Sequence, residues 1–287
     1  MNILDDIKLQ YKIGGIANRL IYWNVGIFLI SIPFFYQFKS EVFEYPRWIS
    51  LSSKPNDILY FPYTFITYIF LHGGFWHLFY NMMILNFSSR LFLTFFTQKQ
   101  LLGLYILSGI FAGLCFVVMS NLMEMSSYLV GASGAIMGIL VATTSYQPLM
   151  DVRLLLIGNV KLWHLTGAIL LLFLLQIGIV NTGGHIAHFG GALFGFIYIR
   201  LLQNGTDLSN IVTRVIDFFV SLFQPNKSTP FKKVHVNPRK QVIKSESKIV
   251  TKDKNQQQID EILDKISQSG YDSLTAEEKE FLFKAGK

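Results

Sequence analysis

Hydrophobic residues are gathered into six long runs along this chain, and polar residues separate one run from the next. Most runs approach the roughly 20 residues with which a helix crosses a hydrocarbon core of about 30 Å. The fourth run is shorter, so it must stand nearly perpendicular to a membrane or begin below its surface. The pattern predicts six membrane-spanning helices at roughly Leu20–Gln37, Phe75–Phe96, Leu101–Leu122, Ala132–Gln147, Leu162–Val180 and Gly184–Leu202.

Composition agrees with this prediction and defines the fold class. Of the 287 residues, 51% are hydrophobic and 15% are charged, which is fewer charges than a soluble protein of this size carries. The first run follows nineteen mostly polar residues and lacks a cleavage site, so we do not interpret it as a signal peptide. We therefore expect an all-α polytopic membrane protein with an N-terminal segment at 1–19 and a six-helix core at 20–203.

Lysine and arginine residues lie mainly on one side of the expected membrane. They precede the first run, separate the second from the third and the fourth from the fifth, and crowd the tail after the sixth. The loops between the third and fourth runs and between the fifth and sixth have none. Because Lys and Arg favour cytoplasmic loops, we expect both termini to be cytoplasmic. The net charge of +7 reflects this bias and requires no nucleic-acid partner.

Two segments between the core and the C-terminus have different patterns. Residues 204–223 carry apolar side chains on one helical face, which is typical of a juxtamembrane helix that lies in the membrane interface or packs on the core. Residues 224–256 are rich in Lys, Ser, Pro and Gln and have no apolar period. We expect this second segment to be a basic, flexible linker beside anionic lipid.

Residues 257–287 return to a helical pattern. A stripe of isoleucine and leucine residues ends at Gly270, and Thr275 and Glu278 have the spacing of a capping box. The pattern predicts a helical hairpin, which is too small to be stable alone. We expect it to dock on an unidentified partner or on a second copy of the chain.

Three of the expected membrane helices begin with polar residues. His77 and Asn81 lie one turn apart at the start of the second helix, Ser133 lies in the sequence GASG at the start of the fourth, and His188 lies near the start of the sixth. All three helices run inward from the outer face in the expected topology, so these residues lie at similar depth. Since polar groups in a bilayer are costly and mark functional sites, we expect one site toward the outer face.

Small residues indicate how closely two of these helices approach. Gly134 and Gly138 on the fourth helix, and Gly191 and Gly195 on the sixth, form small-xxx-small faces. Such faces let two helix backbones pack in direct contact. Contact along this seam would bring a serine and a histidine within hydrogen-bonding distance.

A serine beside a histidine suits nucleophilic hydrolysis. A neutral imidazole takes the proton of the attacking hydroxyl. The tetrahedral oxyanion then needs donors, which the Ser133 backbone N–H, the Asn81 amide and the His77 imidazole can supply. No Asp or Glu occupies the embedded part of the second, fourth or sixth run. We therefore expect Ser133 and His188 to act as a dyad without the third, acidic group of a triad.

The sequences HGGFWHLFYN, GASG and AHFGGALFG resemble the three signature motifs of the rhomboid intramembrane serine proteases, in the family's order and on the second, fourth and sixth helices. The resemblance covers about residues 20–203 and implies a six-transmembrane-helix rhomboid-type bundle with a cytoplasmic C-terminal tail. It implies that Ser133 is the nucleophile and His188 the general base. It also implies that His77 and Asn81 stabilise the oxyanion and that no cofactor takes part.

The same resemblance implies the substrate class and the membrane. Transmembrane proteins would be cleaved near their outer ends, where helix-breaking residues let the chain unwind into the site. The protein would lie in the plasma (inner) membrane, with its active site toward the outer face. Gly131 matches the glycine beside the family's oxyanion site. Several relatives stack an aromatic residue, four positions after the nucleophile, on the general base, and this chain has Met137 there.

Two other classes of function stay open at this point. Histidines in or near the membrane, such as His185 and His188 on one helix face, could bind a metal or a haem, although metal sites favour carboxylate or thiolate ligands that this region lacks. A catalytically silent rhomboid-like protein would bind membrane proteins without cleaving them. Such relatives typically lose the serine or the histidine, and this chain keeps both. We interpret His72 and His185 as structural, able to bond a loop carbonyl, and His164 as an interfacial anchor, and we assign no metal ligand.

Overall fold

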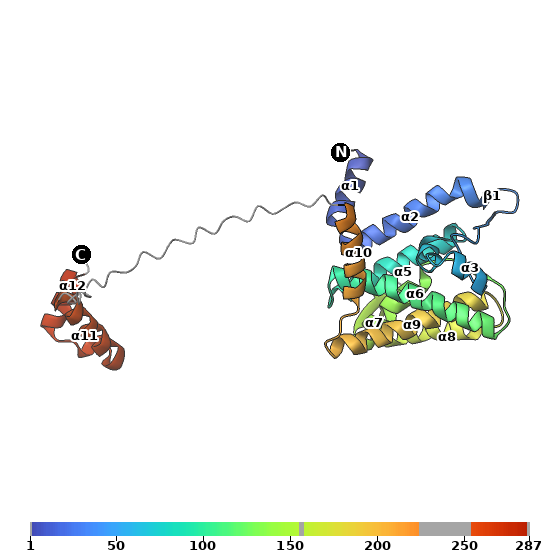
Figure 1. Ribbon diagram of the computed structural model, residues 1–287. Helices are drawn as coiled ribbons and strands as arrows, with labels where there is room; N and C mark the ends of the chain where they lie inside the picture. The colour runs from blue at the N-terminus through green and yellow to red at the C-terminus, as the bar shows by residue number, and fades with distance from the viewer. Residues whose placement is uncertain (1, 155–157, 224–253, 286–287) are drawn as a thin grey trace, which may run out of the picture. The chain divides into compact units, whose positions relative to one another are not determined.

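The computed structural model describes residues 2–154, 158–223 and 254–285. The chain divides into two compact units, Met1–Pro225 and Asn226–Lys287. In the first unit, most of the long helices lie along a common axis and form a bundle (Figure 1). The second unit is a pair of short helices. The expected linker over 224–256 lies largely outside the described residues, and its last three residues belong to the first helix of the second unit.

The bundle has a helix at each of the six expected positions. Three of the six, α2, α6 and α9, are long and apolar enough to cross a membrane, and α7 and α8 are shorter apolar helices. The fourth expected helix is indeed short, and the fifth ends four residues before its expected end, ahead of Gly178 with a φ of +83°. The bounds are α2 (Gly15–Phe35), α5 (Phe75–Leu93), α6 (Gln98–Leu122), α7 (Ser133–Tyr146), α8 (Leu162–Gln176) and α9 (Thr182–Gln203).

The expectation of an all-α fold needs a correction. The described residues include three small antiparallel sheets of two strands each, and each depends on a partner strand that no periodicity reveals. A further helix precedes the first span where we expected only a polar segment. These additions are α1 (Ile3–Ile13), β1 (Tyr36–Gln37) with β2 (Val42–Phe43), β3 (Leu51–Ser52) with β4 (Tyr128–Leu129), and β5 (Asp151–Leu154) with β6 (Gly158–Lys161).

The loop between α2 and α5 folds into short helices against the bundle. Its helices are α3 (Pro55–Tyr60), α4 (Thr64–Thr67) and the 3₁₀ helix η1 (Tyr68–Phe70). Tyr68 is fully buried, and its hydroxyl donates to the Gly109 carbonyl of α6 at 2.6 Å. The loop is thereby fixed to the helix that lies beneath it.

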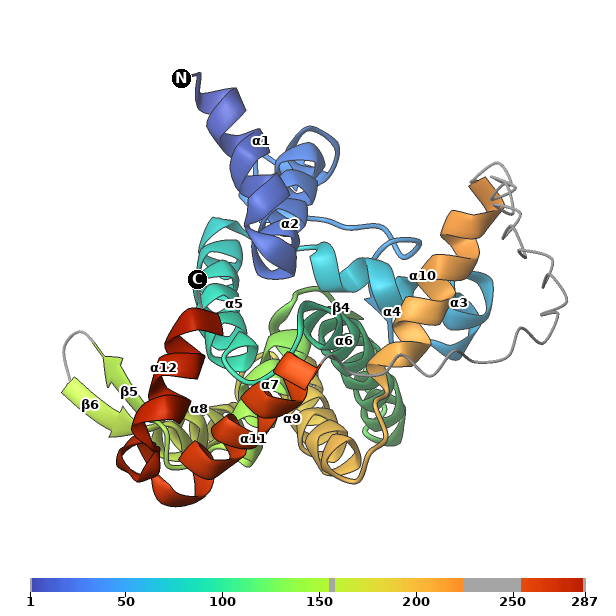
Figure 2. The ribbon, with the colours of Figure 1, turned by 90° about the vertical axis from the view of Figure 1, so that its left-hand side faces the viewer.

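Helix α7 is the centre of the bundle. It contacts α5, α6, α8 and α9, and most of its side chains are buried. Figure 2, turned by 90°, shows the bundle helices from one end. The short α7 therefore lies inside a ring of neighbours, which shields the residues on its first turn from lipid.

Helix α10 (Ser209–Phe223) crosses the end of the bundle instead of extending it, as both views show (Figures 1 and 2). Its start is anchored by Asp207, whose carboxylate accepts from the Tyr198 hydroxyl at 3.1 Å, the Gln100 amide at 3.1 Å and the Ser209 N–H at 2.9 Å. Ser209 packs on Gly103 of α6. Beyond this anchor, the apolar side chains of α10 are largely exposed.

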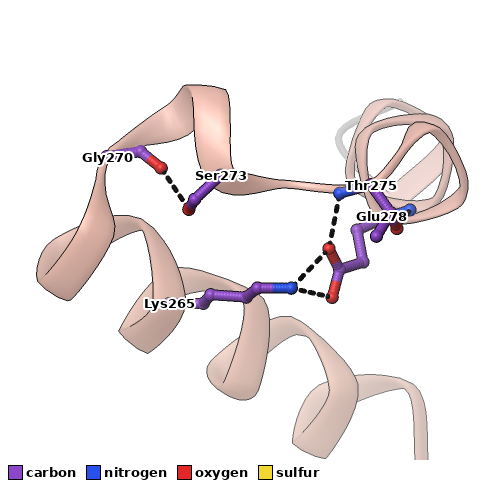
Figure 3. Close-up of polar contacts among 5 residues, drawn as sticks. All are labelled: Lys265, Gly270, Ser273, Thr275 and Glu278. Atoms are coloured by element: carbon purple, nitrogen blue, oxygen red, sulfur yellow. Dashed lines mark hydrogen bonds and ion pairs between the residues drawn. The ribbon is translucent and has the colours of Figure 1, made fainter.

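The second unit is a helical hairpin, α11 (Lys254–Ser269), the 3₁₀ helix η2 (Tyr271–Ser273) and α12 (Ala276–Ala285). Gly270 ends α11 with a φ of +78°. Thr275 and Glu278 form the predicted capping box: the Thr275 N–H donates to the Glu278 carboxylate at 2.7 Å, and the Glu278 N–H donates to the Thr275 hydroxyl at 3.3 Å. Lys265 contacts the same carboxylate from α11 at 2.9 Å (Figure 3).

Candidate active site

Ser133 is the first residue of α7, and the segment before it sets its position. Strand β4 pairs with β3 through Leu129 and Leu51, and the Gly131 N–H donates to the Tyr68 carbonyl at 3.0 Å. Gly131 has a φ of +130°, a conformation that side chains disfavour. The resulting turn leads directly into the helix. Ser133 thus lies where backbone N–H groups have no acceptor within the helix.

Two glycines of α9 bring its backbone against α7. A Cβ atom on Gly191 would overlap the Gly134 carbonyl, and one on Gly195 would overlap the Gly138 carbonyl. The predicted close packing of the two small-residue faces is therefore confirmed. Any larger residue at these positions would force the two helices apart.

This packing places a histidine of α9 on the serine of α7. The Nε2 atom of His188 lies 2.7 Å from the Ser133 Oγ atom. The His188 side chain is buried, with 9% of its surface exposed. Its Nδ1 atom is also buried and has no hydrogen-bond partner among the described residues. The pair is consequently a dyad in geometry, because no carboxylate of the described residues bonds the second nitrogen of the imidazole.

The His188 imidazole contacts an aromatic ring instead of a carboxylate. Phe173 of α8 packs on the His188 imidazole, with ring centroids 4.1 Å apart and planes inclined by 40°. Sequence reasoning missed this residue and noted only that Met137 cannot supply the family's aromatic ring. Phe173 lies in the apolar sequence LLLFLLQ, where nothing distinguishes it from lipid-facing neighbours.

His77 also lies close to the serine. The Gly73 N–H donates to its Nδ1 atom at 3.2 Å, so a neutral ring carries its proton on Nε2. A Cβ atom built on Gly131 would stand 3.0 Å from His77 Nε2 and 3.7 Å from Ser133 Oγ. The absence of a side chain at Gly131 therefore leaves a space that both residues border.

Asn81 lies one turn further along α5 and is nearly buried, with 6% of its surface exposed. Its side-chain Nδ2 donates to the His77 carbonyl at 2.8 Å. This bond occupies one of the two N–H donors of the amide. The bond holds the amide against the helix turn that carries His77 and leaves a second donor.

The remaining histidines lie outside this arrangement. His72 is fully buried, and its ring packs edge-on against His77 at 5.2 Å. Neither of its ring nitrogens makes a hydrogen bond of standard geometry within the described part of the chain. Burial, and secondarily the neighbouring His77, lowers the pKa of His72 to about 3. His185 packs beside Phe173 at 5.5 Å, and His164 packs on Trp163 at 3.9 Å.

Metal-ligating side chains do not gather in this region. Over residues 2–154, 158–223 and 254–285, no three His, Cys, Asp or Glu side chains are placed so that they could hold one metal ion. His185 and His188 do share a helix face, with ring centroids 5.7 Å apart. The polar contact of the His188 ring is made by Nε2, and its partner is the Ser133 hydroxyl.

Comparison with known families identifies the domain. Residues 62–204 match the model of the rhomboid domain, and residues 250–284 match a family of unknown function (DUF6576). No curated protein matches the chain. The protein is a multi-pass membrane protein of the rhomboid family, a family that includes serine proteases. The matched range begins after α2, so it covers less of the chain than the 20–203 expected from the motifs.

Proposed function

We propose that this rhomboid-family protein is an intramembrane serine endopeptidase that hydrolyses peptide bonds of transmembrane substrates. The observation that carries the proposal is the 2.7 Å contact between Ser133 Oγ and His188 Nε2. A hydroxyl becomes a useful nucleophile when a base within hydrogen-bonding reach takes its proton. In this pair, His188 is the base and Ser133 the nucleophile.

The reaction follows from the positions of these groups. Ser133 Oγ attacks the carbonyl carbon of the scissile bond while its proton passes to His188 Nε2. The tetrahedral intermediate collapses when His188 returns that proton to the leaving amine, which leaves an acyl-Ser133 ester. A water molecule, deprotonated by His188, then hydrolyses the ester and restores the free enzyme.

The oxyanion of the intermediate would occupy the space beside Gly131. The His77 Nε2–H borders that space, and the second N–H of Asn81 is the further side-chain donor we assign to it. The backbone N–H of Ser133, at the positive end of the α7 dipole, is the third donor. Three donors fixed before the substrate arrives stabilise the charge without reorganisation.

Phe173 takes part through orientation. A catalytic imidazole in a triad is held by a carboxylate on its second nitrogen, and His188 has no such contact among the described residues. The aromatic ring at 4.1 Å restricts rotation of the imidazole. We therefore assign Phe173 the role of a positioning residue for His188.

The orientation in the membrane is part of the same proposal. With six spans and both termini cytoplasmic, the first turns of α5, α7 and α9 face the outer side of the plasma (inner) membrane. Helix α10 would then lie in the inner interface. This placement is supported by its course across the bundle end and by exposed apolar side chains such as Phe218, Phe219 and Leu222.

The test is cleavage of a single-span substrate in proteoliposomes. The substrate carries helix-breaking residues near its outer end, and the products are sized by mass spectrometry. The intact chain should cleave it, and Ser133→Ala and His188→Ala should not. The buried Ser89→Ala on α5, whose hydroxyl has no hydrogen-bond partner among the described residues, is the matched serine control and should retain full activity.

The outcome also separates the alternatives. A silent, substrate-binding rhomboid-like protein would bind the substrate in both the intact chain and Ser133→Ala and would cleave it in neither. A metal-dependent reaction would persist in Ser133→Ala and stop on addition of a chelator. Either result would overturn the proposal.

A further inference from the structure

The peptide unit between His72 and Gly73 is held at both of its polar ends. Its carbonyl, which belongs to His72, accepts a hydrogen bond from the Tyr45 hydroxyl at 2.9 Å. Its N–H, which belongs to Gly73, donates to His77 Nδ1 at 3.2 Å. The orientation of this single peptide plane therefore determines which nitrogen of His77 can carry the proton.

Tyr45 is placed to hold that plane. It follows β2 in the loop after α2, and its ring packs on Phe43, stacked at 5.5 Å, and on Phe35, tilted at 5.6 Å. Its hydroxyl also lies 3.0 Å from Ser31 Oγ on α2. Burial raises the pKa of Tyr45 above its usual value, although its hydrogen bonds to Ser31 and to the His72 carbonyl act in the opposite direction. The hydroxyl consequently stays protonated and remains a donor at neutral pH.

We propose that Tyr45 is a positioning residue for the oxyanion donor His77, acting through the His72–Gly73 peptide. By holding the carbonyl, it keeps the Gly73 N–H directed at Nδ1 and so leaves the ring proton on Nε2, the nitrogen that borders the space beside Gly131. A rotated peptide would remove that donor and allow the other tautomer, which presents a lone pair to the oxyanion. The effect of Tyr45 on catalysis rests on the proposed proteolysis, whereas its effect on the His77 tautomer does not.

The tautomer can be measured directly. In protein labelled with ¹⁵N-histidine in lipid bilayers, the ring signals of His77, assigned by their loss in His77→Ala, should show a bare Nδ1 and a protonated Nε2. Tyr45→Phe keeps the aromatic packing and removes the hydroxyl, and it should produce a fraction with the proton on Nδ1. The matched control is Tyr36→Phe. Tyr36 packs on the same Phe43 ring at 5.0 Å, but it is not one of the residues that hold the His72–Gly73 peptide.

Kinetics provide the second readout. Tyr45→Phe should lower kcat by about 3- to 10-fold, the range for loss of one hydrogen bond, and leave KM unchanged. In a His77→Ala background the same substitution should have no further effect on kcat, because its only route to the oxyanion has been removed.

Several results would overturn the inference. The wild-type spectrum alone does so if His77 carries its proton on Nδ1, even if Tyr45→Phe fails to fold. The inference is also wrong if a folded Tyr45→Phe variant keeps the wild-type tautomer. It is wrong as well if Tyr45→Phe lowers kcat by the same factor in the wild-type and His77→Ala backgrounds. If the intact chain cleaves no substrate, the proposed proteolysis fails while the tautomer measurement still decides the role of Tyr45.

Discussion

The helix bundle and the C-terminal hairpin use polar groups in opposite ways. In the hairpin, the polar side chains of the turn have local structural partners: Lys265 and the Thr275 N–H contact Glu278, and the Ser273 hydroxyl donates to the Gly270 carbonyl (Figure 3). These contacts cap and join two short helices, so the fold itself explains them.

The bundle is stabilised mainly by contacts other than polar ones. Its helices meet through glycine contacts and buried apolar side chains, and the contact between Ser133 and His188 closes no turn and caps no helix. Burying such groups in a membrane protein is costly. A polar pair that has no structural role and lies where small residues bring two helices together is therefore a candidate for chemistry.

Among these predictions, the greatest loss of kcat is expected from a change at the proposed oxyanion site. Asn81→Ala removes the side-chain donor that we assign to the oxyanion, so kcat should fall by about 10²- to 10³-fold with little change in KM. Initial rates of substrate cleavage in proteoliposomes measure this. If kcat is unchanged, Asn81 serves only to hold the His77 turn through its 2.8 Å bond, and the functional interpretation of this polar residue is wrong.

The second prediction concerns the close contact between α7 and α9. Gly191→Ala places a methyl group on the Gly134 carbonyl and must separate α7 from α9. A shift of about 1 Å between nucleophile and base costs on the order of 10²-fold in rate. The control is Gly167→Ala on α8, where a Cβ atom meets nothing within 4 Å and activity should be retained. Equal activity in the two variants would show that close approach of α7 and α9 is not required.

A smaller effect is expected from the ring beside the base. Phe173→Leu keeps an apolar side chain but removes the flat surface that packs on His188, and kcat should fall by about 3- to 10-fold, as for a lost aromatic pair. Phe87→Leu is the matched variant, since Phe87 packs in the same apolar cluster as Phe173, while the ring contacts of His188 among the described residues are with Phe173 and His185. A larger loss from Phe87→Leu would indicate that general packing, and not orientation of His188, explains the result.

The smallest effect concerns the hairpin and its pH dependence. The Lys265 ammonium, followed by the Thr275 N–H, holds the pKa of Glu278 below its usual value. A lowered folded-state pKa means that this stabilisation is present above the usual glutamate pKa and is lost as the pH falls through the lower value. Because solvent screens this ion pair, its effect on the stability of the hairpin is small. A ¹³C titration of the Glu278 carboxyl in the full chain should show the low midpoint, and Lys265→Met should raise it. An unchanged midpoint in Lys265→Met would contradict the assigned cause.

Much of the bundle could be predicted because hydrophobic length is a strong signal in membrane proteins. The ends of α5, α6 and α9 lie within a few residues of their expected positions. Gly191 and Gly195 could be assigned to a helix contact from spacing alone, and that contact then aligned Ser133 with His188. The capping box of Thr275 and Glu278 is likewise a local pattern.

The remainder depends on tertiary partners. The two-residue strands β3 and β4 have no periodicity of their own, since their pairing joins segments more than 70 residues apart. Phe173 could not be distinguished within an apolar run, because its role comes from packing on a residue of another helix. Tyr45 was missed because its partner is a backbone carbonyl, which sequence does not mark. Sequence could therefore point to the proposed reacting groups but not to the groups that would orient them.

Covalent labelling of the serine tests the Ser133–His188 dyad most directly. Purified protein in bilayers is treated with a fluorophosphonate, and the adduct is located by peptide mass spectrometry. We predict a single adduct on Ser133, formed at a rate that falls to background in His188→Ala and is unchanged in Ser89→Ala. An unlabelled Ser133 in protein that still cleaves its substrate, or labelling at the same rate without His188, would contradict the dyad.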